Sequence, residues 1–210
     1  MSEWLQPGER LDELKPGRFR ILQKAEGFRF GMDTVLLADF ARIRPRDRVG
    51  DFGTGTGILP LLLLDRDKGC AFEAFELQES MADMAARTMA LNGLTDQVRV
   101  HCLPVEHSAE VLAPNSLDVI VCNPPYGVPG TTLTNPAEDR RISRHQGEEG
   151  LLPWYRAAYR ALKGKGRLAM VYPAPRLWEA MRDLAACGLM PKRLRCVYPG
   201  ISKPMNLVLL

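Results

Sequence analysis

The segment Asn123-Pro124-Pro125-Tyr126 combines residue types that suit the capture of a planar group carrying an amino substituent. It follows the apolar run 119–122, which predicts a buried strand of a parallel sheet. Two consecutive prolines lack backbone N–H groups and fix φ, so the strand must end at Asn123 and the chain beyond it is stiffly extended. The Asn123 side-chain carbonyl and the Pro124 carbonyl can each accept one N–H of the amine, while Tyr126 offers a face for stacking a flat ring. A proline-rich turn without function is the alternative for this segment taken alone.

A second set of residues, 51–57, predicts a nucleotide-type cofactor site at a strand-to-helix turn. Glycines at 53, 55 and 57 let a ligand approach the backbone closely, and Asp51 precedes the first of them by two positions. Glu76 ends the next expected strand, where a carboxylate can bind both hydroxyls of a ribose. A dinucleotide fingerprint would need a glycine at the position of Ile58. The spacing Asp-x-Gly-x-Gly-x-Gly resembles instead motif I of class I S-adenosylmethionine (SAM) methyltransferases.

This resemblance implies SAM as the cofactor, with Asp51 organising the loop and the methionine end and Glu76 at the ribose. The residues that we expect to hold it are Asp51, Gly53, Thr54, Gly55, Gly57, Glu76, Leu77 and Asn123. The sequence departs from the family at two positions. Gly50 replaces a usual aliphatic residue, which we expect to loosen its strand without abolishing binding. Leu103 stands near the position of an Asp that usually binds the adenine amino group, so backbone groups are expected to serve there.

The order of expected elements predicts the fold. From Arg48 onward, strands alternate with helices, which favours a parallel sheet covered by helices on both faces. The resemblance to class I SAM methyltransferases implies, in addition, an α/β, Rossmann-like class I methyltransferase fold with a mostly parallel seven-stranded sheet. The methyltransferase domain should span 46–210, after a lead-in and cofactor-covering segment, 1–45. Within that segment, residues 1–17 are polar, residues 18–22 are expected to form a short strand, and a helix capped by Asp33 or Thr34 should follow. The last residues, 208–210, resemble the middle of a strand, so we expect the chain to be truncated at its C-terminus.

The composition agrees with a single globular domain of 210 residues. The net charge of the chain, +3, is compatible with a nucleic-acid partner but is too small to indicate one. The five cysteines form no C-x-x-C pair and no metal spacing, so we interpret them as reduced core thiols of a cytoplasmic protein that binds no metal. The longest apolar run, 58–64, is too short to cross a bilayer, and no membrane partner is expected. Oligomeric state is left open.

Further segments resemble the bacterial tRNA1(Val) adenine-37 N6-methyltransferase family: 21–23, 27–30, 33–40, 76–78, 92–94 and 143–145. The resemblance implies methylation of an adenine N6 amine in the anticodon loop of tRNA, where bases are already unpaired. It also implies that the N-terminal block folds over the cofactor, which makes Arg29 and Asp33 candidates for that site, with helix capping and surface pairing as the alternative. Basic residues in the long polar loop 127–148 are expected to bind RNA phosphates: Arg140, Arg141, Arg144 and His145.

Three other substrates or roles remain open from the sequence: methylation of rRNA bases, methylation of a release-factor glutamine amide, and cofactor binding without catalysis. The glutamine enzymes would be expected to carry a longer helical N-terminal domain than the residues before Arg48 provide. For an aromatic amine, hydrogen bonds to Asn123 and Pro124 would favour a more tetrahedral nitrogen, with its lone pair directed at the methyl group. Orientation and electrostatic preorganisation then suffice, and no strong general base is needed.

Overall fold

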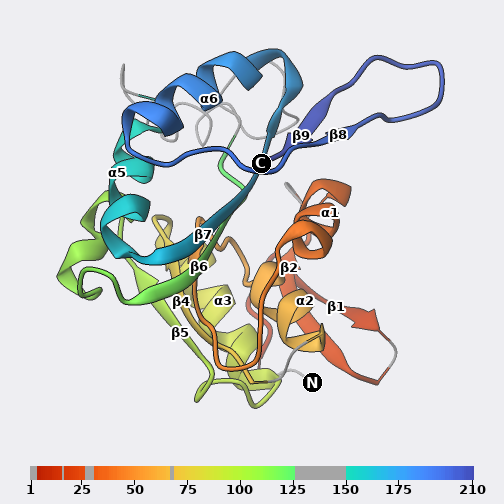
Figure 1. Ribbon diagram of the computed structural model, residues 1–210. Coiled ribbons are helices and arrows are strands. Elements are labelled where there is room, and N and C mark those ends of the chain that lie inside the picture. Colours follow the sequence, from red (N-terminus) through yellow and green to blue (C-terminus); the bar gives the residue numbers. More distant parts are fainter. Residues whose placement is uncertain (1–3, 16, 27–30, 67–68, 126–149) are drawn as a thin grey trace.

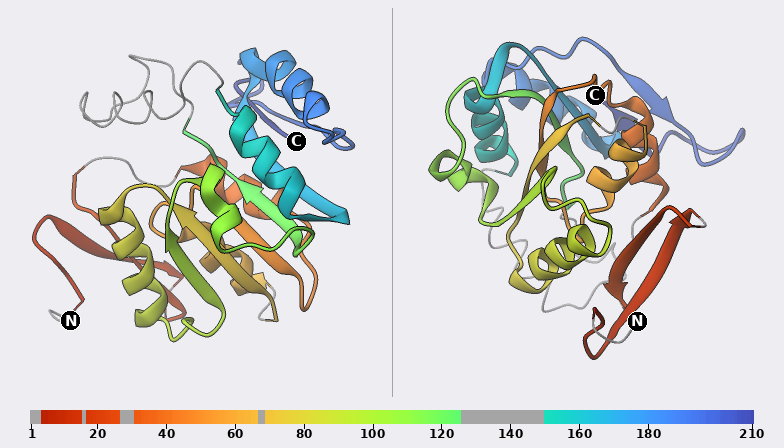
Figure 2. Two further views of the ribbon diagram at one scale, coloured as in Figure 1. Left: turned by 90° about the vertical axis from the view of Figure 1, so that its left-hand side faces the viewer. Right: turned by 90° about the horizontal axis from the view of Figure 1, so that it is seen from below.

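A seven-stranded sheet lies between two layers of helices, with a two-stranded hairpin beside it (Figures 1 and 2). The computed structural model describes residues 4–15, 17–26, 31–66, 69–125 and 150–210. The strand order is β5-β4-β3-β6-β7-β9-β8. The strands are β3 (Arg48–Phe52), β4 (Ala71–Glu76), β5 (Val98–Cys102), β6 (Leu117–Cys122), β7 (Leu162–Pro173), β8 (Arg195–Val197) and β9 (Leu207–Leu209).

The first five strands of this order are parallel, and β9 is antiparallel to both β7 and β8. The prediction of a mostly parallel seven-stranded sheet is therefore confirmed. The chain runs outward from β3 to β4 and β5, then returns to place β6 on the other side of β3. At this switch point Phe52 lies opposite Cys122, so the residues that follow these two strands emerge side by side. Open α/β sheets bind their ligands in the crevice at such a point.

Helices cover both faces and create two cores. One face carries α1 (Met32–Phe40), α2 (Ile58–Arg66) and α3 (Glu79–Leu91), and the other carries η1 (Val105–Glu110), α5 (Leu152–Ala161), η2 (Ala174–Arg176) and α6 (Leu177–Ala186). The first core gathers Leu37, Leu61 and Val121, while the second gathers Phe52, Ile120 and Tyr155. Because β6 contributes alternate side chains to both cores, its apolar run is buried on both faces.

The N-terminal region differs from expectation. Residues expected within a polar lead-in form β1 (Glu9–Lys15), which pairs antiparallel with β2 (Phe19–Lys24). This hairpin lies against α3, where the backbone amide of Leu22 donates to the Thr88 hydroxyl over 3.2 Å. Helix α1 begins at Met32 with Gly31 as its N-cap, so the prediction that Asp33 or Thr34 caps this helix is wrong.

The cysteines are free thiols, but they are not all core residues. Cys70 and Cys122 are buried, Cys187 is half-buried, and Cys102 and Cys196 are exposed. The prediction of core thiols is thus wrong for the last two, because their strands lie toward the two edges of the sheet. No helix in the described ranges has the length and hydropathy needed to span a bilayer.

Candidate active site

The glycine turn after β3 is shaped by backbone conformations that other residues rarely adopt. Gly53 has φ of +79° and Gly57 has φ of +87°. A Cβ atom at Gly57 would lie 2.5 Å from Met89 Cε, and one at Gly53 would lie 3.1 Å from Trp154 Cη2. The turn is held to β4 because the backbone amides of Gly53 and Thr54 both donate to the Phe75 carbonyl, over 3.0 and 2.9 Å. The glycines therefore have two functions: they adopt the positive φ that the turn requires, and they leave room for Met89 and Trp154 to pack against it.

Gly50 shows how the sequence accommodates its departure from the family pattern. A Cβ atom there would lie 2.7 Å from Leu117 Cδ1 and 3.2 Å from Ile120 Cγ1. The side chains of the neighbouring strand fill the space that a larger residue would take. Strand β3 pairs with β4 and β6 around this position, so the glycine leaves the ladder continuous.

Asp51, near the end of β3, places a carboxyl group without a hydrogen-bonding partner among the described residues next to the glycine turn. Its side chain is fully buried, and neither carboxyl oxygen makes a hydrogen bond to any described residue. Burial raises the pKa of Asp51 to about 7, and the charge of Glu76 adds to the rise. The Thr54 hydroxyl is also buried without a hydrogen bond to the described part of the chain. Buried polar atoms of this kind fit a ligand with a cationic, hydrogen-bonding group such as the ammonium of SAM.

Glu76 is fixed at the end of β4 by backbone amides. Its Oε2 accepts from the Gly55 amide and its Oε1 from the Gln78 amide, each over 2.9 Å. Burial raises the pKa of Glu76, and the bonds from backbone amides oppose this rise. Each carboxylate oxygen keeps a second lone pair, so the group can still accept from a ribose hydroxyl.

The surroundings of Glu76 suit a flat apolar ring. Leu77 is 37% exposed although it is a large apolar residue, and Leu103 is half-buried at the end of β5. Cys102 lies opposite Glu76 in the register of the two strands. Burial raises the pKa of the Cys102 thiol, and the charges of Glu79 and Glu76 add to the rise. Leu103, near the position where the family usually has an Asp, thus forms an apolar wall with Leu77 beside Glu76.

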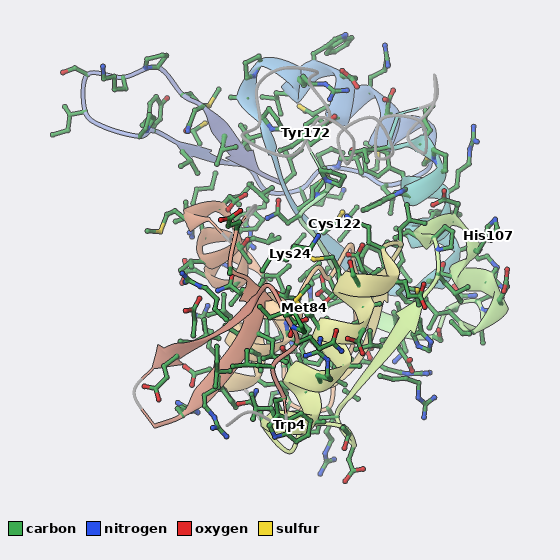
Figure 3. All side chains as sticks on the ribbon, turned by 180° about the vertical axis from the view of Figure 1, so that it is seen from behind. Trp4, Lys24, Met84, His107, Cys122 and Tyr172 are labelled. Atoms are coloured by element: carbon green, nitrogen blue, oxygen red, sulfur yellow. The ribbon has the colours of Figure 1, made fainter. Side chains whose placement is uncertain are left out.

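Asn123 follows β6, next to the glycine turn, with its amide held in one orientation. Its Nδ2 donates to the Thr34 hydroxyl over 2.9 Å and to Asp33 Oδ2 over 3.2 Å. Because the NH2 group faces α1, Oδ1 is the atom that can accept a hydrogen bond from a substrate amine. Cys122, labelled in Figure 3, marks the end of β6 immediately before this residue.

The structure brings together the expected residues that it describes. Asp51, the three glycines and Thr54 lie at the end of β3, Glu76 and Leu77 at the end of β4, and Asn123 and its two prolines at the end of β6. Asp33 lies beside Asn123. The other expected site residues fall outside the described ranges: Arg29, Tyr126, Arg140, Arg141, Arg144 and His145.

Two residues of the site were missed by the sequence analysis. Thr34 was considered only as a helix cap, and Trp154 of α5 was not considered at all, although its ring packs on Gly53. Neither has a local sequence signal, because both contacts join segments that are distant in the chain. Among the described residues, no group of three or more His, Cys, Asp and Glu side chains could hold a metal ion.

Comparisons with known proteins agree with this geometry. The sequence pattern of the methyltransferase small domain family matches residues 30–142, which is more than half of the chain. The chain belongs to this family. It is 32% identical over 195 residues to a tRNA1(Val) (adenine(37)-N6)-methyltransferase from Tolumonas auensis, and the match covers 92% of this chain and 79% of that one.

Solved structures share the fold. A predicted O-methyltransferase from Agrobacterium tumefaciens superimposes with a TM-score of 0.64 at 21% identity, covering 85% of this chain and 78% of that one. A SAM-dependent methyltransferase from Aquifex aeolicus gives a TM-score of 0.61 at 18% identity, covering 84% and 87%. The prediction of a class I methyltransferase fold is thus confirmed.

Proposed function

We propose that this chain transfers a methyl group from SAM to the exocyclic N6 amine of an adenine in tRNA. The observation that carries the proposal is the orientation of Asn123: its amide nitrogen is bound to Thr34 and Asp33, beside a glycine turn at the switch point of the sheet. An acceptor held in this way suits an amine donor. A cofactor-binding module without catalysis has no need of it.

The cofactor-binding residues have complementary chemistry. Asp51 and Thr54 offer buried acceptors for the methionine end, and Glu76 offers carboxylate oxygens for the ribose. Leu77 and Leu103 can pack against the adenine ring. When bound, SAM supplies an electrophilic methyl group on a sulfonium. Arg29 and Asp33 are proposed to support the same site from the N-terminal block.

In the proposed reaction, Asn123 Oδ1 accepts one N–H of the adenine amine and the Pro124 carbonyl accepts the other. These bonds withdraw the nitrogen lone pair from the ring and direct it toward the methyl group. As the amine nitrogen gains the methyl carbon, the carbon–sulfur bond would break to leave a neutral thioether, and the nitrogen would then release one proton to solvent. The proline pair holds both acceptors on a stiff segment, and Pro124 is buried. Tyr126 is proposed to stack on the base after it leaves its neighbours.

We propose that the basic residues Arg140, Arg141, Arg144 and His145, which lie outside the described ranges, bind RNA phosphates. Two other basic groups, at 163–167 and 192–195, contribute Lys163, Arg167, Lys192 and Arg193 to one surface hollow beside β7. Much of their charge is already compensated: Lys163 pairs with Asp118 over 2.7 Å and Arg167 with Asp47 over 3.2 Å. The Arg193 guanidinium stacks on the Phe40 ring at 3.8 Å. These two groups are therefore weaker candidates for phosphate binding than the loop.

The relative from Tolumonas auensis supports tRNA as the substrate and position 37 of valine tRNA as the first target to test. We propose the cytoplasm as the place of the reaction, because such a substrate is used there. An rRNA base and a release-factor glutamine are the alternatives that the experiment must separate.

The test is transfer of tritiated methyl from SAM to total tRNA, to rRNA and to a release factor, followed by nucleoside analysis. We expect N6-methyladenosine in valine tRNA. Label only in the release factor would overturn the proposal, and label only in rRNA would retain the chemistry but change the target. A reaction with the Asn123→Ala variant controls for contaminating enzymes.

A further inference from the structure

Thr34 and Asp33 of α1 together hold the NH2 group of Asn123. The Asn123 Nδ2 atom lies 2.9 Å from Thr34 Oγ1 and 3.2 Å from Asp33 Oδ2. Thr34 is only 3% exposed, so its hydroxyl is a fixed partner at the boundary of α1 and the sheet. Asn123 itself is half-buried, which leaves part of the residue accessible.

The carboxylate of Asp33 is itself fixed. Its Oδ1 accepts from the Thr34 backbone amide over 2.9 Å, which directs Oδ2 toward Asn123. On the other side, a Cβ atom at Gly31 would lie 2.6 Å from Asp33 Oδ1. The absence of a side chain at position 31 therefore leaves room for this carboxylate orientation.

An asparagine amide has two similar orientations, which differ by a half-turn about its last torsion. In one orientation the carbonyl faces the substrate, and in the other the NH2 group does. Only the first can accept an N–H from an amine, because the second would oppose two donors. The Asp33 carboxylate can only accept, so it selects the first orientation, since a flipped amide would bring its carbonyl oxygen against it. The Thr34 hydroxyl supports the same orientation, because its own proton is directed at Asp33 Oδ1 over 3.5 Å and its oxygen is left to accept from Asn123.

We propose that Thr34, assisted by Asp33, is a positioning residue that keeps Asn123 Oδ1 directed at the substrate amine. This inference rests on the proposed function, because it assigns Thr34 a part in the same methyl transfer. A positioning role and a merely stabilising role for Thr34 predict different effects of its substitution. A stabilising contact would affect folding, whereas a positioning contact affects turnover through Asn123.

The experiment compares Thr34→Val, which removes the hydroxyl at nearly constant shape, with Thr34→Ser, which keeps it. We expect Thr34→Val to lower kcat at least about 10-fold, with little change in SAM affinity, and Thr34→Ser to retain most of the activity. Thr88→Val is the matched control. Like Thr34, Thr88 is a buried threonine, and its hydroxyl accepts a hydrogen bond from the Leu22 backbone amide. Because Thr88 lies between α3 and β2, the kcat of Thr88→Val should stay at the wild-type value.

A double-mutant cycle with Asn123→Ala separates positioning from a general structural effect. In single-turnover assays, Thr34→Val should cause no further loss once the Asn123 amide is gone. Wild-type kcat in Thr34→Val, or an equal loss in the Asn123→Ala background, would overturn the inference. If Thr34→Val does not fold, Gly31→Ala provides the second route, since it displaces the Asp33 carboxylate and should also lower kcat. A wild-type protein that methylates no substrate would count against the proposed function instead.

Discussion

Glu76 accepts a hydrogen bond from the backbone amide of Gly55, with 2.9 Å between the nitrogen and Oε2. The expected ribose-binding group thus also fixes the glycine turn, 21 positions earlier in the chain. Its other oxygen accepts from Gln78 at the start of α3. The carboxylate is therefore oriented by the protein before any ligand arrives, which lowers the cost of ordering it on binding.

Glu76→Gln should weaken SAM binding by about 10- to 100-fold, because it replaces one acceptor by an NH2 group that faces a backbone N–H. Calorimetry with SAM measures the change. Glu79→Gln is the matched control, since Glu79 is exposed at the start of α3 and should leave the affinity unchanged. Equal affinities for Glu76→Gln and the wild type would rule out this carboxylate as a cofactor ligand.

Asp51→Asn should stabilise the ligand-free protein more at pH 8 than at pH 5. Burial raises the Asp51 pKa from 3.8 to about 7, so the folded protein holds this proton more tightly than the unfolded chain does. The resulting stability is fully present below the unfolded pKa and is lost as pH rises through about 7. Of the total of roughly 4 kcal/mol, roughly 3 kcal/mol is lost between about pH 5 and pH 8. Thermal unfolding at both pH values measures the effect. A gain that does not depend on pH would contradict it.

The same substitution should have the opposite effect on the cofactor. A cationic ligand favours the ionised form of Asp51, so wild-type affinity for SAM should increase between pH 6 and pH 7.5. The Asp51→Asn variant should bind SAM more weakly than the wild type, and its affinity should depend much less on pH. A variant that binds SAM as tightly as the wild type at pH 7.5 would show that Asp51 serves only the fold.

Much of the central sheet could be predicted because its strands are buried on both faces and their sequences are apolar. The run 119–122 is an example, since both cores receive its side chains. The glycine turn was also predictable, because positive φ is a local property that only glycine adopts readily. Strand β1 was not, since Glu9–Lys15 is mostly polar and Glu9 is bound by Arg87 of α3, which is 78 positions away in the chain.

The positions of candidate site residues were predictable where a short motif carries them, as for Asp51 at the end of β3 and Glu76 at the end of β4. The contact between Asn123 and Thr34 was not, because these residues are 89 positions apart. It depends on how α1 packs against the sheet, which no spacing rule reveals. The packing of Trp154 on Gly53 was missed for the same reason.

Asn123→Ala should leave SAM affinity nearly unchanged while kcat falls by about 100-fold or more, because one preorganised hydrogen-bonding partner of the amine is lost. Steady-state kinetics on tRNA together with calorimetry separates the two quantities. An equal loss of SAM affinity would instead assign Asn123 to cofactor binding, and wild-type turnover would contradict the mechanism.

Arg87→Ala should release the N-terminal hairpin from α3 without unfolding the sheet. The Arg87 guanidinium contacts both oxygens of Glu9 over 2.6 and 2.8 Å, donates to the Trp4 carbonyl over 2.6 Å, and is only 17% exposed (Trp4 is labelled in Figure 3). We expect a local loss of about 2 kcal/mol, measured as faster hydrogen exchange in β1 and β2. Arg99→Ala, on exposed β5 surface, is the control.

The pH dependence of this contact has a definite sign. The hydrogen bond from Arg87 lowers the pKa of Glu9, so the contact is present above the ordinary Glu pKa and is lost as pH falls through the lowered value. Protection of the hairpin amides, which is the slowing of their exchange relative to that of an unstructured chain at the same pH, should therefore fall in acid in the wild type. In Arg87→Ala this protection should be low at both neutral and acidic pH, and high protection in that variant would show that other contacts hold the hairpin.

Asn123→Asp should abolish most activity, and Asp33→Asn in the same chain should restore part of it. The single change brings a carboxylate oxygen to about 3.2 Å from Asp33 Oδ2, where two negative groups repel each other. The paired change recreates one donor and one acceptor with their places exchanged, which leaves an acceptor directed at the substrate. We expect the paired variant to be at least about 10-fold more active than Asn123→Asp alone, at saturating SAM. SAM affinity is measured for both, so that a loss of cofactor binding caused by Asp33→Asn is not mistaken for a loss of positioning. A paired variant that binds SAM but is no more active than the single variant would show that Asp33 does not act through Asn123.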